Sequence, residues 1–366
     1  MKLVIIFLGR SGGAVPYSFE MIKALLNENV EIFTVLSEYI SNKKEWEVLE
    51  KMYDKLTLRF IETYSNKIEF VIDFLKKSSY RELERQINHF HPDAIYLPMI
   101  SLNARKFKKS FEKYPLITTV HDYVQHPGMK NPISNFIFKS IEKKSTKFVV
   151  LTKKFRPLLS SKYLIPETNI AYIPHANFTY YNLNGKQPEY SLKNRILFFG
   201  RITKYKGVSV LLEAMCEIIT INDKIILDIV GNGNLNQRDM DIIKNHSDRI
   251  RLINIWVSDD EVWDYFSSAD LTILPYIEAS QSGVVAISYS CGRTVIATAT
   301  GGLEEQVVPG GGIVIPPKDS HALANAILAL YNDGSLVEKN QQAFIYAKTK
   351  LTWSESAKKL LKLIKT

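Results

Sequence analysis

The chain of 366 residues lacks the features that mark membrane-spanning and secreted proteins. Its longest apolar runs, such as Leu3 to Leu8 and Ile225 to Val230, are far shorter than the ~20 residues that cross a bilayer. No charged n-region, long apolar h-region or small-residue cleavage site follows Met1, so no secretory signal is apparent. We therefore expect a cytoplasmic protein without a membrane span.

Cysteines and metal-binding patterns are also scarce. Only Cys216 and Cys291 occur, without CxxC spacing, and their neighbours predict buried helix positions in a reducing compartment. No cluster of His, Cys and carboxylates has metal-ligand spacing, and no Gly-x-Ser-x-Gly nucleophile elbow is present. The acidic run Ser258-Asp259-Asp260-Glu261 precedes an apolar-periodic helix, where such residues cap the N-terminus. We expect no metal site.

Charge is unevenly distributed along the chain. Residues 1–186 contain 28 basic and 18 acidic residues, a net charge of +10, whereas residues 187–366 contain 19 and 20, a net charge of −1. The basic clusters lie beside aromatic or aliphatic residues, and they include Lys43-Lys44, Lys76-Lys77, Arg105 to Lys109 and Lys143-Lys144. Two interpretations stay open: solvated helix faces, or attraction to an anionic membrane surface or phosphorylated lipid. No nucleic-acid-binding pattern accompanies the charge, so nucleic acid is not an expected partner.

Short apolar strands alternate with amphipathic helices, a pattern that predicts an α/β fold with parallel sheets. The length favours two domains of roughly 100–200 residues each, and residues 177–194 gather turn-forming residues typical of a connection. We place the domains at 1–186 and 187–352. The strands expected in the first are Leu3–Leu8, Glu31–Leu36, Ala94–Leu97, Ile117–Val120, Phe148–Leu151 and Ile170–Ile173. Those expected in the second are Ile196–Phe199, Ile225–Val230, Ile250–Ile253, Leu271–Leu274, Val295–Ala297 and Ile313–Ile315.

Two loops of the second domain are candidates for binding one anionic ligand. The first, Phe199-Gly-Arg-Ile-Thr-Lys-Tyr-Lys-Gly207, places Arg201 and Lys206 where a guanidinium and an ammonium can surround one pyrophosphate. The second, Pro275-Tyr-Ile-Glu-Ala-Ser-Gln-Ser-Gly-Val284, combines Glu278 with main-chain amides at a helix start. This pairing indicates nucleotide-sugar chemistry, although a lone Lys-Gly would more often be a surface feature.

Glycine pairs follow two other predicted strands. Gly12 and Gly13 precede a helix whose first turn contains Pro16, and they can receive a phosphate or a sugar oxygen. Gly231 and Gly233 can let the main chain approach a base or ribose. Each pair can equally form a plain turn, and neither completes the G-x-G-x-x-G fingerprint that a dehydrogenase would need.

Taken together and in chain order, these motifs resemble glycosyltransferase family 4 of the GT-B enzymes, the glycosyl transferases group 1. The matching residues are Gly12-Gly13, His121-Asp122, Ile173-Pro174, Gly200-Arg201, Lys206-Gly207, Val230-Gly231-x-Gly233, Ala269-Asp270, Glu278, Cys291-Gly292, Val295 to Thr298 and Gly301-Gly302-x-x-Glu305. The resemblance implies two Rossmann-like domains facing a cleft, with the donor held by the C-terminal domain and the acceptor by the N-terminal one. It also implies retention of anomeric configuration without a metal, and a final helix over 353–366 that crosses back to the first domain.

The resemblance also implies roles for single residues. Arg201 and Lys206 would hold the donor diphosphate, Glu278 would contact sugar hydroxyls, and His121 would lie near the anomeric carbon. His126 and His175 are weaker candidates.

The chain departs from the family's E-x7-E motif, because Ala286 stands where the second glutamate is expected. The segment from Glu278 resembles a Ser-Gln-Ser-Gly variant found in envelope-polysaccharide transferases, in which the amides of Ser282, Gly283 and Val284 cradle phosphate. Glu305 is the candidate for the missing ribose contact, and its alternative role is that of a helix-capping carboxylate.

The sequence thus predicts a metal-independent, retaining glycosyltransferase of cell-envelope polysaccharide synthesis, of the capsule or O-antigen type. The donor is expected to be a UDP-sugar, with GDP- and dTDP-sugars as alternatives, and no other cofactor is expected. The acceptor would be lipid-linked or a glycan, and the basic first domain would attach the enzyme peripherally to the inner face of the cytoplasmic membrane. The alternative is a noncatalytic sugar-nucleotide or glycan-binding protein of the same fold.

Overall fold

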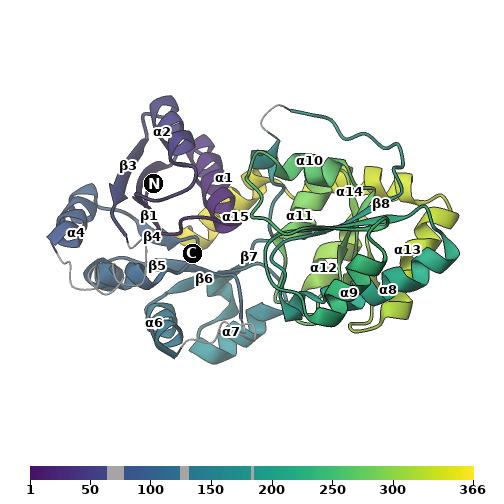
Figure 1. Ribbon diagram of the computed structural model, residues 1–366. Coiled ribbons are helices and arrows are strands. Elements are labelled where there is room, and N and C mark those ends of the chain that lie inside the picture. Colours follow the sequence, from purple (N-terminus) through teal and green to yellow (C-terminus); the bar gives the residue numbers. More distant parts are fainter. Residues whose placement is uncertain (64–77, 124–131, 183–184) are drawn as a thin grey trace. The chain divides into compact units, whose positions relative to one another are not determined.

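The computed structural model describes residues 1–63, 78–123, 132–182 and 185–366, which form two compact units (Figure 1). The first unit contains Met1–Pro174 and Trp353–Thr366, and the second contains His175–Thr352. Lys76, Lys77 and the candidate His126 lie outside the described residues.

The division after Pro174 differs from the expected boundary between residues 186 and 187. The segment that follows Pro174 is held within the second unit, because the Asn177 N–H donates to the Leu351 carbonyl at 2.7 Å. The neighbouring Phe178 N–H donates to Ser290 Oγ at 2.9 Å, and the Phe178 side chain is buried. Residues with turn-like composition therefore belong to the second core rather than to a free connection.

A seven-stranded parallel sheet forms the first unit, in the order β3-β2-β1-β4-β5-β6-β7. Its strands are β1 (Lys2–Phe7), β2 (Glu31–Ser37), β3 (Leu56–Ile61), β4 (Ala94–Leu97), β5 (Leu116–Val120), β6 (Lys147–Val150) and β7 (Ile170–Tyr172). Its helices are α1 (Ala14–Asn27), α2 (Lys43–Met52), α4 (Ser78–Phe90), α5 (Lys108–Lys113), α6 (Pro132–Glu142), α7 (Phe155–Tyr163) and α15 (Trp353–Lys365). Six of these seven strands match the ranges expected from the sequence, and β3 was missed.

The final helix, α15, belongs to the first unit although the second unit precedes it in the chain. Lys147 at the start of β6 donates from Nζ to the carbonyls of Leu363 and Ile364, at 2.8 and 3.1 Å. A cation on the last carbonyls of a helix satisfies groups that have no partner inside the helix. The side chains of Ala357, Leu360 and Leu363 are buried, which fixes the apolar face of α15 in this unit.

The second unit has a six-stranded parallel sheet in the order β10-β9-β8-β11-β12-β13. Its strands are β8 (Arg195–Phe199), β9 (Ile226–Val230), β10 (Ile250–Ile253), β11 (Leu271–Leu274), β12 (Thr294–Thr298) and β13 (Ile313–Ile315). Its helices are α8 (Val208–Ile221), α9 (Gln237–Asn245), α10 (Val262–Ser267), α11 (Gly283–Ser290), α12 (Leu303–Val307), α13 (Ser320–Asn332) and α14 (Leu336–Lys350). All six strands lie where the apolar runs predicted them.

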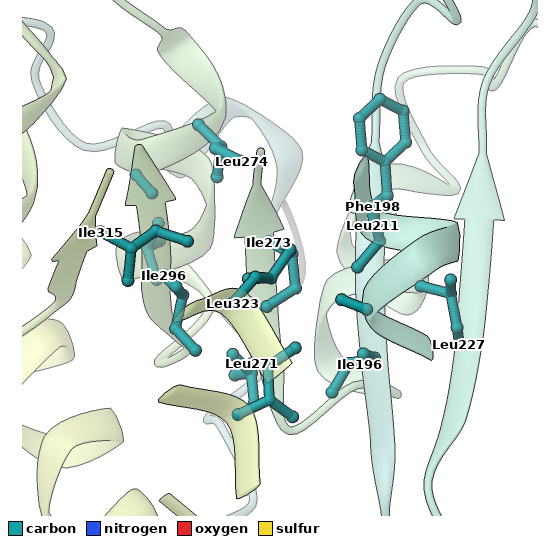
Figure 2. Close-up of a cluster of buried hydrophobic side chains, with 14 of the residues drawn as sticks. Ile196, Phe198, Leu211, Leu227, Leu271, Ile273, Leu274, Ile296, Ile315 and Leu323 are labelled. Atoms are coloured by element: carbon teal, nitrogen blue, oxygen red, sulfur yellow. The ribbon is translucent and has the colours of Figure 1, made fainter. Parts of the chain in front are cut away.

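Helices cover both faces of this sheet, so its central strands are apolar on both sides, as parallel sheets require. Figure 2 shows Phe198 of β8, Ile273 of β11 and Ile296 of β12 among the buried side chains, with Leu211 of α8 and Leu323 of α13 packed with them. Each of these five side chains is at most 1% exposed. This rigid core fixes where the loops at the carboxyl ends of the strands begin.

Candidate functional site

The carboxyl ends of β8 and β11 form the topological switch point of the second unit. The chain passes from β8 to β9 and β10 on one side of the sheet, and then returns to β11 on the other side of β8. In open α/β sheets ligands bind outside the strand ends at such a point. The loop after β8 carries Arg201 and Lys206, and the loop after β11 carries Glu278 and Ser282.

Main-chain contacts join these two loops directly. The Tyr205 carbonyl accepts the N–H groups of Ile277 and Glu278, at 2.8 and 3.4 Å. Gly207 has φ +72°, and a Cβ at this position would lie 1.8 Å from the Pro275 carbonyl oxygen. Glycine is therefore required for the two backbones to approach so closely, and the contact brings Lys206 and Glu278 to one edge of the sheet.

Lys206 is held over an aromatic ring that the sequence analysis did not single out. Its Nζ lies 3.7 Å from the ring centroid of Tyr276, a distance typical of a cation–π interaction. Tyr276 is 1% exposed, and its hydroxyl lies 3.3 Å from Ser282 Oγ. Tyr276 thus connects the ammonium of one loop to the helix start that follows the other. The signal was present, because Tyr276 lies between Pro275 and Glu278 in the quoted motif.

Arg201 and Glu278 are both exposed at this edge. Within the described part of the chain, neither side chain takes part in an ion pair. The guanidinium and the carboxylate are therefore available to a ligand.

Gly231 and Gly233 have a packing role at this edge. Their φ angles are +137° and +153°, and added Cβ atoms would lie 2.1 Å from the Gly200 carbonyl oxygen and 2.0 Å from that of Ile202. Ile202 and Gly233 also form a parallel β-bridge. These glycines let the loops after β8 and β9 pack closely. This packing explains their presence without a contact to a base or ribose.

The start of α11 differs from the expected cradle of three amides. The Ser282 N–H donates to Gln306 Oε1 at 2.8 Å, and the Val284 N–H donates to Ser282 Oγ at 3.3 Å. Among the hydrogen bonds of the described residues, the Gly283 N–H has no protein partner. Of the three predicted donors, Gly283 is the one left for a ligand. Gln306 was not expected from the sequence, and its place next to Glu305 on α12 was the only clue.

The loop after β12 lies against the loop after β11, because the Gly302 N–H donates to the Ser280 carbonyl at 3.0 Å. Glu305 lies on the short helix that follows and is half-buried. Ala286, at the position of the absent second glutamate, is 2% exposed inside α11. A ribose contact from that position is therefore missing, and Glu305 remains a prediction.

Two buried side-chain oxygens in these loops, Thr203 Oγ1 and Gln281 Oε1, have no hydrogen-bond partner in the described part of the chain. Buried polar atoms are normally paired, and those that are not need an explanation. A polar ligand at this edge would supply the partner. His175, a weaker candidate, is buried, and its ring contacts Phe178 with a centroid separation of 5.7 Å.

The remaining candidates lie in the first unit. Gly12, with φ +83°, and Gly13 form the turn between β1 and α1. His121 follows β5, and its Nε2 donates to the Pro98 carbonyl at 2.7 Å, which assigns the proton to that nitrogen. Its ring contacts Tyr17 of α1 edge-on, with centroids 5.3 Å apart. Burial lowers the pKa of His121, so the imidazole is neutral at pH 7.

The acidic run before α10 was expected to cap the helix with a serine or aspartate, but the N-cap residue is Glu261 and it makes no side-chain capping bond. The Ser258 N–H donates to Glu261 Oε2 at 3.2 Å, which closes the turn that leads into the helix. Within the described ranges no group of three His, Cys, Asp or Glu residues is arranged to hold a metal. Cys291 is buried but follows the end of α11, and Cys216 lies in α8 but is half-buried, so neither is the buried helix position that was expected.

The second unit is similar in sequence to known proteins. Residues 193–333 match the family described as "Glycosyl transferases group 1". A D-inositol 3-phosphate glycosyltransferase of Thermobifida fusca is 25% identical over 177 residues, which cover 45% of this chain and 41% of the relative. A phosphatidyl-myo-inositol mannosyltransferase of Mycobacterium leprae is 29% identical over 182 residues, with coverage of 48% and 47%. The alignments thus span less than half the length of these relatives.

The whole chain has a close structural neighbour. The crystal structure of Anabaena Alr3699/HepE in complex with UDP and glucose covers 100% of this chain and 99% of its own, with a TM-score of 0.72 and 15% identity. Together with two parallel-sheet α/β units, this similarity shows that the chain has the GT-B fold. No described helix has the length and apolar character needed to span a membrane.

Proposed function

We propose that this chain is a glycosyltransferase that moves a sugar from a nucleotide-sugar donor to an acceptor hydroxyl. The observation that carries the proposal is the joining of the Arg201–Lys206 loop to the Glu278–Ser282 loop at the switch point of the second sheet. The family match over residues 193–333 and the neighbour that binds UDP and glucose support the same conclusion. UDP is accordingly the first nucleotide to test, before GDP and dTDP.

In the proposed reaction the acceptor oxygen bonds to the anomeric carbon while the bond from that carbon to the diphosphate oxygen breaks. The acceptor proton passes to the departing diphosphate, so no separate carboxylate base is needed. Arg201 and Lys206 would stabilise the negative charge that develops on the diphosphate, together with the Gly283 N–H. Because the leaving group accepts the proton on the face where the acceptor attacks, the anomeric configuration would be retained.

The other candidate residues have narrower roles in this proposal. Glu278 would bind sugar hydroxyls and Glu305 the ribose. His121, being neutral, suits hydrogen bonding to the donor sugar better than charge compensation. No metal is required, since two basic side chains supply the positive charge that a divalent cation would otherwise provide.

The acceptor is proposed to be lipid-linked or a glycan of the cell envelope. The relative from Mycobacterium leprae, described as a phosphatidyl-myo-inositol mannosyltransferase, supports an acceptor at a membrane. The excess of basic residues in the first unit supports attachment to the inner face of the cytoplasmic membrane.

Turnover of UDP-sugars by purified variants tests the reaction. Arg201→Ala and Lys206→Ala should each lower the rate of UDP release at least about 100-fold, the scale of losing one charge-stabilising group. Lys204→Ala is the matched control, because Lys204 is an exposed lysine of the same loop and should leave the rate nearly unchanged. Wild-type activity in both Arg201→Ala and Lys206→Ala would refute this site. Donor binding without turnover by the wild-type chain would favour the noncatalytic alternative.

A further inference from the structure

The basic charge of the first unit is concentrated in one part of it. The unit as a whole contains 31 basic and 19 acidic residues, a net charge of +12, whereas the second unit has 16 and 19, a net charge of −3. Between Pro132 and Tyr163, from the start of α6 to the end of α7, eight basic residues accompany a single acid, Glu142. These two helices and the strand between them therefore carry much of the excess.

Helices α6 and α7 lie side by side on one face of the sheet. They are the crossover helices of the consecutive parallel strands β5, β6 and β7, and such crossovers share one hand and hence one face (Figure 1). Glu142 at the end of α6 accepts hydrogen bonds from Lys162 and Tyr163 at the end of α7. The helices thus run parallel with their ends in contact, and together they present one outer surface.

The outer face of α6 combines an aromatic ring with two lysines. Phe136, Lys139 and Lys143 are exposed and follow helical spacing, and the Lys143 N–H continues the helix by donating to the Lys139 carbonyl at 3.0 Å. Ile137 and Ile141 are buried, so the opposite face of α6 is the one that packs into the core of the unit. Phe136 is 75% exposed. No described acidic residue pairs with Lys139 or Lys143.

α7 adds similar side chains to the same surface. Leu158 is 40% exposed, and Leu164, in the left-handed conformation that ends the helix, is 91% exposed. We define the α6–α7 surface by its exposed residues Phe136, Lys139, Lys143, Lys154, Leu158, Lys162 and Leu164. Exposed apolar side chains surrounded by lysines are the pattern of helices that lie in the headgroup region of a bilayer.

Its net positive charge distinguishes the α6–α7 surface from the other places where apolar side chains are exposed. Val48 and Met52 of α2 are 56% and 67% exposed, but α2 has three lysines and three glutamates and hence no net charge. Ile221 and Ile345 are also exposed, but they belong to the acidic second unit. Apolar and cationic groups coincide at the α6–α7 surface.

We infer that the α6–α7 surface docks the chain on an anionic phospholipid bilayer, with Phe136, Leu158 and Leu164 in the headgroup region and with Lys139 and Lys143 paired with lipid phosphates. The inference rests on the proposed function, since a lipid-linked acceptor would bring the enzyme to the bilayer. It locates membrane attachment in these two helices rather than in the basic unit as a whole.

Cosedimentation of the full chain with vesicles tests the inference. Vesicles of phosphatidylcholine mixed with phosphatidylglycerol should bind the wild-type chain, pure phosphatidylcholine should not, and raised salt should release it. Lys139→Glu with Lys143→Glu should lower partitioning at least about tenfold, and Phe136→Ser with Leu164→Ser should weaken it at unchanged salt dependence. Val48→Ser with Met52→Ser is the matched control and should bind as wild type.

The outcomes separate this inference from the proposed function. Each variant is checked for an unchanged Tm, and its nucleotide binding, which depends on the second unit, should equal that of the wild type. The inference is refuted if the wild-type chain does not bind anionic vesicles. It is also refuted if all three double variants bind them equally well. Vesicle binding without any nucleotide binding would instead overturn the proposed function alone.

Discussion

Lys206 shows how much of a site residue's role depends on its neighbours. The sequence identified Lys206 from its place between Arg201 and Gly207, but it gave no information on where the ammonium points. In the structure, Tyr276 lies under Nζ and joins it to Ser282. Lys206 and Tyr276 belong to two motifs that are far apart in the chain, so the sequence shows that both residues are present but not that they are in contact. The motif was therefore predictable, and its geometry was not.

At the start of α11, the sequence predicted the helix but not which of its amides are free. The sequence correctly indicated a helix start at Ser282, because serine is a favoured N-cap. The same capping bond occupies the Val284 N–H, however, and Gln306 from another helix occupies the Ser282 N–H. The serine that caps the start of the helix thus occupies one of the amides that were expected to bind phosphate, and Gln306 occupies another.

His121 should make the stability of the chain depend on pH in a predictable direction. Its pKa is lowered in the folded state by burial, from an ordinary value of about 6.5. The unfolded chain therefore binds a proton more readily, so the stabilisation is complete above pH 6.5 and is lost as the pH falls through the lower, folded-state pKa. Between pH 7.5 and pH 5.5, the Tm of wild type should fall more than that of His121→Asn.

The matched control for this comparison is His89→Asn, since His89 is exposed on α4. It should show the same fall in Tm as the wild-type chain. If the curves of wild type and His121→Asn run parallel over this range, the imidazole is not held neutral by burial.

At the scale of elements, burial decided which strands were predictable. Most of the twelve expected strands are continuous apolar runs, as is typical of strands buried on both faces, although Ile250–Ile253 contains Arg251. The missed strand, β3, reads Leu-Thr-Leu-Arg-Phe-Ile, and its burial alternates because it lies at the edge of the sheet. Thr57 and Arg59 interrupt the apolar run of β3. The apolar pattern therefore did not predict this strand.

The contact between the loops after β8 and β11 depends on Gly207, and this is measurable. Gly207→Ala should lower the free energy of unfolding by more than about 1 kcal/mol, the cost of a side chain in the left-handed region. Gly334→Ala is the matched control, because Gly334 has nearly the same φ, +70°, but has nothing within 4 Å of an added Cβ.

The difference between the two variants in urea denaturation isolates the clash with the Pro275 carbonyl oxygen. Equal losses of stability would mean that the two loops are not in the contact described, and the grouping of Lys206 with Glu278 would then fail as well.

For the molecule as a whole, the order of elements and the two-unit organisation followed from the sequence, whereas the boundary did not. Residues 177–182 have the composition of a linker, but Phe178, Tyr180 and Tyr181 are buried in the second unit. The turn-forming residues around these aromatic side chains led the sequence pattern to predict a linker where the segment is packed in the core. The assignment of α15 and its four lysines to the first unit sharpens the charge asymmetry, whereas the shift of the boundary to Pro174 does not.

Binding of UDP to the purified full chain tests the central claim most directly. A ligand that binds only the folded state raises its stability, so UDP should raise the Tm of the wild-type chain and of Lys204→Ala without added metal. Lys206→Ala should lose most of this shift. No shift with UDP, GDP or dTDP in the wild type, or an equal shift in Lys206→Ala, would contradict a nucleotide-diphosphate site at the switch point of the second unit.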